Sequence, residues 1–201
     1  MKRFLSNIFY NIFLICLIII IFIFFQSETK SESKILVGVN ELHESLIKIS
    51  NKTINSDNLA LIDDVVKNSY DLEKMGKIII GVDWKQMDTK SKKEFINVFK
   101  RFISVNYFRR FNKIDELDFE HQTVKVIGDK FKLARVILTA DNEKLKMDYL
   151  LGFKNEKWKI FDVLIDGSIS EVATKKSDFK KIIKEEGVSG LVKNLRIRNQ
   201  F

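Results

Sequence analysis

Side chains that could carry out acid–base, nucleophilic or metal chemistry are sparse in this sequence of 201 residues. There are two histidines, His43 and His121, and a single cysteine, Cys16, which lies within an apolar run. No His-x-x-x-His pair, Cys-x-x-Cys motif or spaced set of carboxylates accompanies them. Metal sites need several such ligands at fixed spacing. The sequence therefore predicts structural or solvent-exposed histidines and no metal or other cofactor.

Motifs for covalent catalysis and phosphate binding are also missing, since neither Gly-x-Ser-x-Gly nor Gly-x-x-x-x-Gly-Lys occurs. Two pairs of adjacent acids, Asp63–Asp64 and Glu185–Glu186, fall in stretches with helical spacing. Neighbouring residues on a helix diverge by about 100°, so neither pair can share one site. Asp162 is a lone carboxylate in an apolar stretch, and a buried carboxylate needs partners. We expect it to be hydrogen-bonded or at an edge, where it orients a neighbouring loop.

The N-terminal residues form the most apolar segment of the chain. Lys2 and Arg3 precede an unbroken apolar run of 14 residues, Ile12–Phe25. A basic start and a short apolar run are typical of a secretory signal. The looser stretch Phe4–Phe25 has 22 residues, enough to span a bilayer as a helix. Two interpretations of this segment stay open: a signal that is cleaved, and an anchor that is retained. In both cases the rest of the chain is exported.

We therefore divide the chain into a signal peptide or membrane anchor with its linker, residues 1–33, and one domain, residues 34–201. The formal net charge is +8, and 32 basic and 26 acidic residues remain beyond residue 30, a charge of +6. This balance suits transient contact with anionic lipid surfaces, and it equally suits a solvated, lysine-rich surface. A nucleic-acid partner is not expected in an exported protein.

Helical spacing of apolar residues marks the first half of the domain and its end. This spacing predicts a helix over residues 34–50. The same spacing recurs from residue 59 to residue 84 and predicts helix there too. Two shorter helical runs, 171–184 and 188–195, close the chain, and Gly187 between them is typical of a helix C-terminal stop.

The most periodic helix follows Asp88–Thr89, which is typical of a helix start. Phe95, Phe99 and Phe102 lie along one face of this helix, and Arg110 ends the apolar stripe. Further Phe residues near its end point largely the other way. We therefore expect the helix to be covered on much of its circumference there.

After Ile114 the apolar period changes to two, which is typical of strands. In the third strand Tyr149 and Leu151 share one face, and in the fourth Trp158 lies on the face opposite to Phe161 and Val163. Short turns between consecutive strands indicate an antiparallel meander. The order predicts an α+β fold in which helices from both ends of the domain wrap a four-stranded sheet. The predicted strands are 119–127, 130–140, 145–153 and 157–165.

Several short motifs follow one another along the domain. They are Gly81-Val-Asp-Trp84, then Phe95, Phe99 and Tyr107, then Trp158-Lys-Ile-Phe-Asp162-Val163, Asp166-Gly167, Ile169-Ser170, Ser177-Asp-Phe179, Gly187-Val-Ser-Gly-Leu191 and Leu195. Their order and spacing resemble the MlaC family, also called toluene-tolerance or organic-solvent-tolerance periplasmic proteins. The resemblance covers roughly residues 37–197. Ser168 departs from the family pattern as an apparent insertion, which bears on partner contacts more than on the fold.

This resemblance implies a nuclear-transport-factor-2-like fold that encloses an apolar cavity, and a periplasmic carrier that holds a phospholipid by its acyl chains. The cargo would move between an outer-membrane lipoprotein–porin complex and the lipid-binding component of an inner-membrane ABC transporter, in an Mla-type system that maintains outer-membrane lipid asymmetry. No catalytic residue is needed, and a monomer is expected. The N-terminal segment would export the protein to the periplasm or tether it to the inner membrane.

Nine side chains are the candidates for contact with the acyl chains. Each would also be apolar in an ordinary filled core, and the sequence does not separate the two cases. Two other functions stay open: a membrane-anchored structural domain of the same fold in an envelope assembly, and an enzyme, which the lack of an acid–base pair disfavours. The candidates are Phe99, Phe102, Ile103, Tyr107, Tyr149, Leu151, Trp158, Phe161 and Val163.

Overall fold

The computed structural model describes residues 34–128 and 130–200. The predicted signal peptide or anchor lies outside these described residues. The chain divides into two units, Met1–Leu36 and Val37–Phe201, and the fold that follows is that of the second unit. Among the described residues, no helix combines the length and the apolar character that a membrane span requires.

The first half of the unit is helical, as predicted, but its second helical stretch is broken into pieces. Residues 34–49 form a helix, followed by α2 (Ser56–Ser69), α3 (Leu72–Ile80) and the 3₁₀-helix η1 (Gly81–Lys85). The break falls at Tyr70 and Asp71, where the Asp71 backbone N–H donates to the carbonyl of Ile160 at 2.8 Å. The Asp71 side chain then caps α3 by accepting from the Lys74 N–H at 3.1 Å. A tertiary contact to a strand thus ends α2, and helical spacing alone could not reveal it.

The Phe-rich helix α4 (Thr89–Phe111) begins where the sequence predicts. Asp88 is its N-cap, and its carboxylate accepts from the Ser91 N–H at 2.6 Å. Phe95 and Phe99 on one face are fully buried, and so is Phe108 on the opposite side. The expectation that α4 is covered on much of its circumference is confirmed.

The sheet is antiparallel and has five strands instead of the predicted four. Its order is β1 (Leu117–Ile127), β2 (Phe131–Ala140), β3 (Glu143–Lys154), β4 (Lys157–Ile165) and β5 (Ile169–Ser170). Asn155 and Glu156, in the turn between β3 and β4, both have positive φ, as a tight two-residue hairpin requires. The short β5 pairs with the end of β4 and was missed because two residues carry no detectable period.

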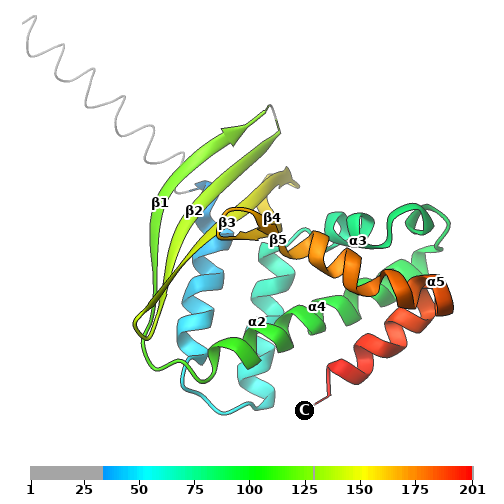
Figure 1. The fold of residues 1–201 in the computed structure, drawn as a ribbon, viewed down its shortest axis with the longest axis horizontal. Coiled ribbons are helices and arrows are strands. Elements are labelled where there is room, and N and C mark those ends of the chain that lie inside the picture. The colour runs from blue at the N-terminus through cyan, green and yellow to red at the C-terminus, as the bar shows by residue number, and fades with distance from the viewer. Residues whose placement is uncertain (1–33, 129, 201) are drawn as a thin grey trace, which may run out of the picture. The chain divides into compact units, whose positions relative to one another are not determined.

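One face of the sheet is covered by helices and forms the core. In Figure 1 the helix of residues 37–49, α2 and α4 lie on the concave side of the curved sheet. Val136, Met147 and Tyr149 lie on this inner face and are nearly or fully buried. Because this core lies within the second unit, residues 37–201 have the properties of an independently folding domain. No helix of the described residues covers the outer face.

An extra residue in β4 corrects the predicted facing of this strand. Leu150 pairs with Asp162 whereas Leu151 pairs with Ile160, which leaves Phe161 as the bulged residue. The bulge shifts the alternation by one position, so Val163 lies on the same inner face as Ile160. Alternation along the sequence placed these two residues on opposite faces, and that prediction is wrong.

Asp162 is hydrogen-bonded, as the sequence analysis allowed, and fastens the end of the sheet to the last helix. Its carboxylate accepts from the Val163 N–H at 2.8 Å, the Ser170 hydroxyl at 2.6 Å and the Val172 N–H at 3.1 Å. Val172 lies in the first turn of α5 (Glu171–Arg198), which is kinked at Gly187 with φ 68°. Asp162 thus ties the first turn of α5, and its N-cap residue Ser170, to the end of β4.

Replacing Asp162 should destabilise the domain. In Asp162→Ala two backbone N–H groups and one hydroxyl lose their acceptor at a buried position, which we expect to cost about 2–4 kcal/mol of unfolding free energy. Urea denaturation followed by circular dichroism measures the loss. Glu185→Ala, on the exposed surface of α5, is the control, with a change of about 0.5 kcal/mol or less. Equal stability of the two variants would show that Asp162 has no anchoring role.

Candidate functional site

A cavity of about 270 Å³ lies between the inner face of the sheet and the helices α4 and α5. Its walls come from α4, from the ends of β2, β3 and β4 near the β2–β3 turn, and from the first turn of α5. The volume exceeds that of the roughly 150 Å³ apolar cavities known to admit a benzene ring.

Five of the nine candidate residues line this cavity. Four of them lie on successive turns of α4, and Val163 comes from β4 after the bulge. The spacing along α4 brings them to one face, and the register of β4 brings Val163 opposite them. The structure thus gathers these five around one hollow, and their contact with lipid stays a prediction. The residues from α4 are Phe99, Phe102, Ile103 and Tyr107.

The other four candidates lie outside the cavity wall. Tyr149 and Leu151 are on the inner face of β3 and buried in the core, where the Tyr149 hydroxyl meets the helix of residues 37–49. Phe161 is the bulged residue and packs against Phe131 with ring centroids 5.3 Å apart. Trp158 lies at the far end of β4, beside a second, more open hollow. Periodicity identified them as apolar, but their distance from the cavity depends on packing.

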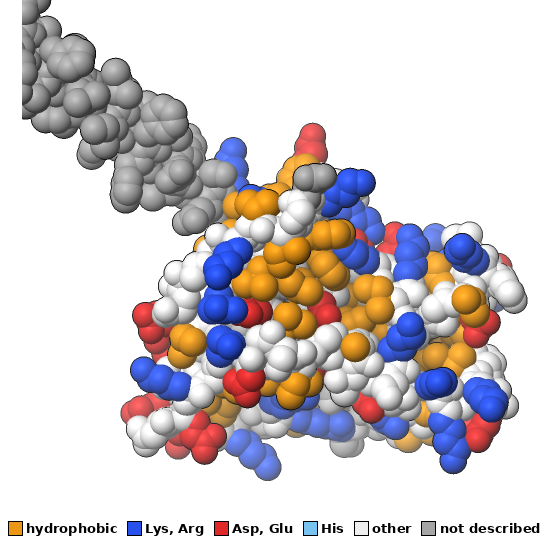
Figure 2. All heavy atoms as spheres, turned by 45° about the horizontal axis from the view of Figure 1, so that its top comes forward, with side chains coloured by type: hydrophobic (Ala, Val, Ile, Leu, Met, Phe, Trp, Pro, Cys, Tyr) orange, Lys and Arg blue, Asp and Glu red, His pale blue; other side chains and the backbone are white. Residues whose placement is uncertain are grey.

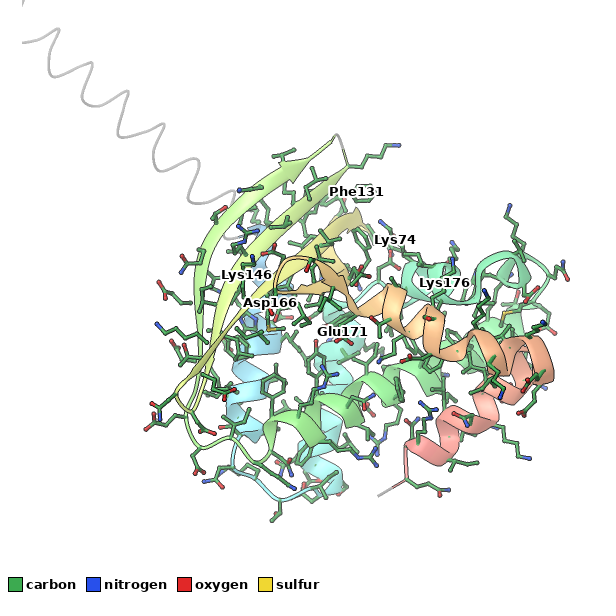
Figure 3. The ribbon with its side chains drawn as sticks, viewed as in Figure 1. Lys74, Phe131, Lys146, Asp166, Glu171 and Lys176 are labelled. Carbon is green, nitrogen blue, oxygen red and sulfur yellow. The ribbon has the colours of Figure 1, made fainter. Side chains whose placement is uncertain are left out.

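The mouth of the cavity is charged, and none of its charged residues is among the nine candidates. Glu171, in the first turn of α5, lies where the sheet and the two helices α4 and α5 meet (Figure 3). Its carboxylate is 3.7 Å from the Arg110 guanidinium and 3.9 Å from the Lys175 ammonium. These ion pairs are too long to be hydrogen bonds. Arg110 had a signal in the sequence, because it ends the apolar stripe of α4.

The interior of the cavity wall is uncharged. Tyr70, at the end of α2, and Tyr107 both line the cavity, and their hydroxyls share a hydrogen bond. Burial raises the pKa of Tyr107 to about 12 and that of Tyr70 well above its ordinary value. Both side chains therefore stay neutral at physiological pH, and the hollow presents mostly apolar groups and two hydroxyls that are joined by one hydrogen bond.

His43, on the helix of residues 37–49, is buried. Its Nε2 lies 2.9 Å from the Tyr149 hydroxyl, and its ring stacks on Phe119 with centroids 3.9 Å apart. Burial, with a smaller contribution from His121, lowers the pKa of His43 to about 3. Its role is therefore structural, as the sequence analysis expected, although its position on the helix did not show this.

This arrangement can enclose an apolar group and hold a charged one at the entrance. Most of the lining is aromatic or aliphatic, and the cations Arg110 and Lys175 lie at the mouth beside one carboxylate. Within residues 34–128 and 130–200, no group of three or more His, Cys, Asp or Glu side chains is placed to hold a metal ion.

Comparisons with known proteins agree with this fold. A sequence model of the family described as MlaC protein matches residues 40–197. A solved structure titled as the phospholipid-binding protein from Ralstonia solanacearum in complex with a phospholipid is similar to the chain, with a TM-score of 0.67 and 21% sequence identity. The alignment covers 83% of this chain and 95% of that one. A search of curated proteins found no match.

The stability of the domain should depend on pH through His43. Below pH 6.5 the unfolded chain protonates this histidine, whereas the folded protein keeps it neutral down to a pKa of about 3. Stability is therefore lost as the pH falls through this window, by up to about 1.4 kcal/mol per pH unit. His43→Gln, whose amide can still bond Tyr149, should lose less stability between pH 7 and pH 4 in urea titrations. Parallel losses in both proteins would contradict this assignment.

Proposed function

The chain belongs to the MlaC family, and we propose on this premise that it binds a phospholipid and carries it across the periplasm. The cargo moves between an outer-membrane lipoprotein–porin complex and the lipid-binding component of an inner-membrane ABC transporter, which maintains outer-membrane lipid asymmetry. The proposal includes a nuclear-transport-factor-2-like fold and export by the N-terminal segment, which either is removed or tethers the protein to the inner membrane. The similar solved structure from Ralstonia solanacearum, which contains a phospholipid, supports the choice of cargo.

The single observation that supports this function best is an apolar hollow with a charged mouth. An acyl chain that leaves the bilayer for water loses about 0.8 kcal/mol per methylene group. A dry apolar cavity replaces the bilayer environment, so exchange between membrane and protein is close to neutral in free energy. A carrier needs this balance because it must both load and release its cargo.

The cavity must expand to hold a whole phospholipid. Its volume of about 270 Å³ is below the range of ligand pockets, roughly 300–1,000 Å³. Two of the residues that line it, Met75 and Met147, have unbranched, flexible side chains that adapt to irregular shapes. The aromatic rings of Phe99 and Phe102 pack against each other with centroids 6.3 Å apart and can separate around an acyl chain.

The lipid head group stays at the mouth in this proposal. A phosphate there meets the Arg110 guanidinium and the Lys175 ammonium, which favour phosphate oxygens as hydrogen-bond acceptors. Their contacts to Glu171 are 3.7 and 3.9 Å long, and Lys175 is also 3.5 Å from Asp178, so the phosphate competes with long ion pairs and not with tight ones.

Native mass spectrometry of residues 34–201 tests the proposal directly. We expect co-purified phospholipid, identified by extraction of the same sample. A folded, lipid-free domain that takes up no phospholipid from vesicles would contradict the carrier and favour a structural domain of the same fold.

Filling the cavity should remove the cargo without unfolding the domain. Ile103 is only half-buried on α4, and Ile103→Trp places a large side chain where acyl chains would lie. We expect at least a tenfold loss of retained phospholipid, because the enclosed volume is occupied. Val82→Trp is the control, since Val82 is 79% exposed in η1 and lies away from the cavity. Equal retention by both folded variants would remove Ile103 from the binding site.

Neutralising the mouth should weaken retention of phospholipids more modestly. In the double variant Arg110→Gln/Lys175→Gln we expect a loss of about 1–2 kcal/mol, because charge-assisted hydrogen bonds at a partly exposed site are lost. Competition with a fluorescent phospholipid measures the affinity. Lys180→Gln/Lys181→Gln removes the same charge from an exposed part of α5 and should leave affinity unchanged. If the two double variants behave alike, the head group does not contact Arg110 and Lys175.

A further inference from the structure

The outer face of the sheet carries an apolar surface at the end where the β1–β2 and β3–β4 turns lie. Strand register places its members on one side of the sheet, with Phe161 added by the bulge. Figure 2 shows apolar side chains gathered at this end of the molecule, with Lys and Arg along the margins. We call it the hairpin-end surface, and its apolar members are Ile127, Phe131, Leu133, Leu150 and Phe161.

Several large apolar side chains at this end of the sheet are exposed to solvent and are not packed into the core. Ile127 and Phe131 are 40% and 37% exposed. On the other side of the same end, Val126 and Phe153 are 70% and 60% exposed. Exposed aromatic and branched side chains gathered in one place mark a site of contact with a partner or a membrane.

Three carboxylates near the hairpin-end surface are paired. Arg135 holds both oxygens of Asp148 at 2.7 Å. The Lys154 ammonium lies 2.9 Å from Asp71 and from Glu73. Glu156, in the β3–β4 turn, is exposed. Internal pairing therefore makes Asp71, Glu73 and Asp148 less available to a cationic partner.

The lysines of the hairpin-end surface, in contrast, form no close ion pair with a carboxylate of the described residues, although Asp71 acts on Lys74 and Lys159 at longer range. Register places Lys125 and Lys159 on the outer face, opposite Leu133 and Gly152. The Lys74 ammonium lies 3.8 Å from the ring centroid of Phe131 and 3.3 Å from that of Phe161. Figure 3 shows Lys74 and Phe131 next to each other at this end of the sheet. Apolar rings and unpaired cations thus occupy one surface.

We propose that the hairpin-end surface docks on the surface of an anionic phospholipid bilayer. Phe131 and Phe161 would lie at the level of the head groups, and Lys74, Lys125 and Lys159 would face lipid phosphates. Lysines near an anionic membrane and buried apolar area both favour such binding. A second copy of the chain fits less well, because a two-fold contact brings the same lysines of both copies together.

Docking in this way leaves the cavity accessible. The mouth at Arg110, Glu171 and Lys175 opens on the helix-covered side of the sheet, and the hairpin-end surface is on the outer side. The protein can therefore stay on a membrane while its mouth remains free. This inference does not depend on the cargo, so membrane docking and phospholipid carriage can fail separately.

Vesicle flotation of residues 34–201 tests the docking without the N-terminal apolar segment. We expect binding to vesicles of phosphatidylcholine with phosphatidylglycerol, weaker binding at high salt, and little binding to phosphatidylcholine alone. Lys125→Gln/Lys159→Gln and, separately, Phe131→Ser should each weaken the partition about tenfold. Lys90→Gln/Lys93→Gln, with the same charge change at exposed positions of α4, is the control and should bind as the unmodified domain does.

Three outcomes would overturn the docking proposal. They are no binding to anionic vesicles, equal loss in the control and test variants, or a dimer in sedimentation analysis that the test variants dissociate, which would make a second copy the occupant. Thermal melts establish that each variant is folded. Native mass spectrometry of the same variants should show unchanged lipid retention, which separates this surface from the cavity.

Discussion

The bulge at Phe161 is the constraint on which the rest of the site depends. By adding one residue to β4, it shifts every later side chain of that strand to the opposite face. Val163 then reaches the cavity wall, and the Asp162 carboxylate accepts from Ser170 and from the first turn of α5. Because α5 begins there, Glu171 and Lys175 lie at the mouth of the cavity. One local irregularity thus positions both the apolar wall and its charged entrance.

The cavity shows how a hollow can persist beside a well-packed core. Around Tyr149 and His43 the rings pack closely, with the His43 ring stacked on Phe119 and bonded to the Tyr149 hydroxyl. Around Tyr107 the hydroxyls of Tyr70 and Tyr107 share one hydrogen bond, and burial raises the pKa of both, so the wall there stays neutral.

The two faces of the sheet have different roles in this protein. Helices lie on the inner face (Figure 1) and enclose the cavity there, whereas the outer face carries the lysines and rings of the hairpin-end surface. Paired acids such as Asp148 leave that surface with a positive character. A chain that binds lipid on one face of a sheet and a membrane on the other would keep loading and docking independent.

The sequence by itself determined the local structure, because local signals act over a few residues. Asp88 marked the start of α4, Gly187 marked the kink in α5, and turn residues such as Asn155 separated the strands. The family resemblance also came from the order of short motifs, and the match over residues 40–197 agrees with it. Only the tertiary structure decided which apolar residues surround a hollow: Phe102 and Val163 do, whereas Leu151 and Trp158 do not. That distinction depends on strand register, on the bulge at Phe161 and on the packing of residues far apart in the chain, and apolar periodicity is the same for a filled core and a hollow one.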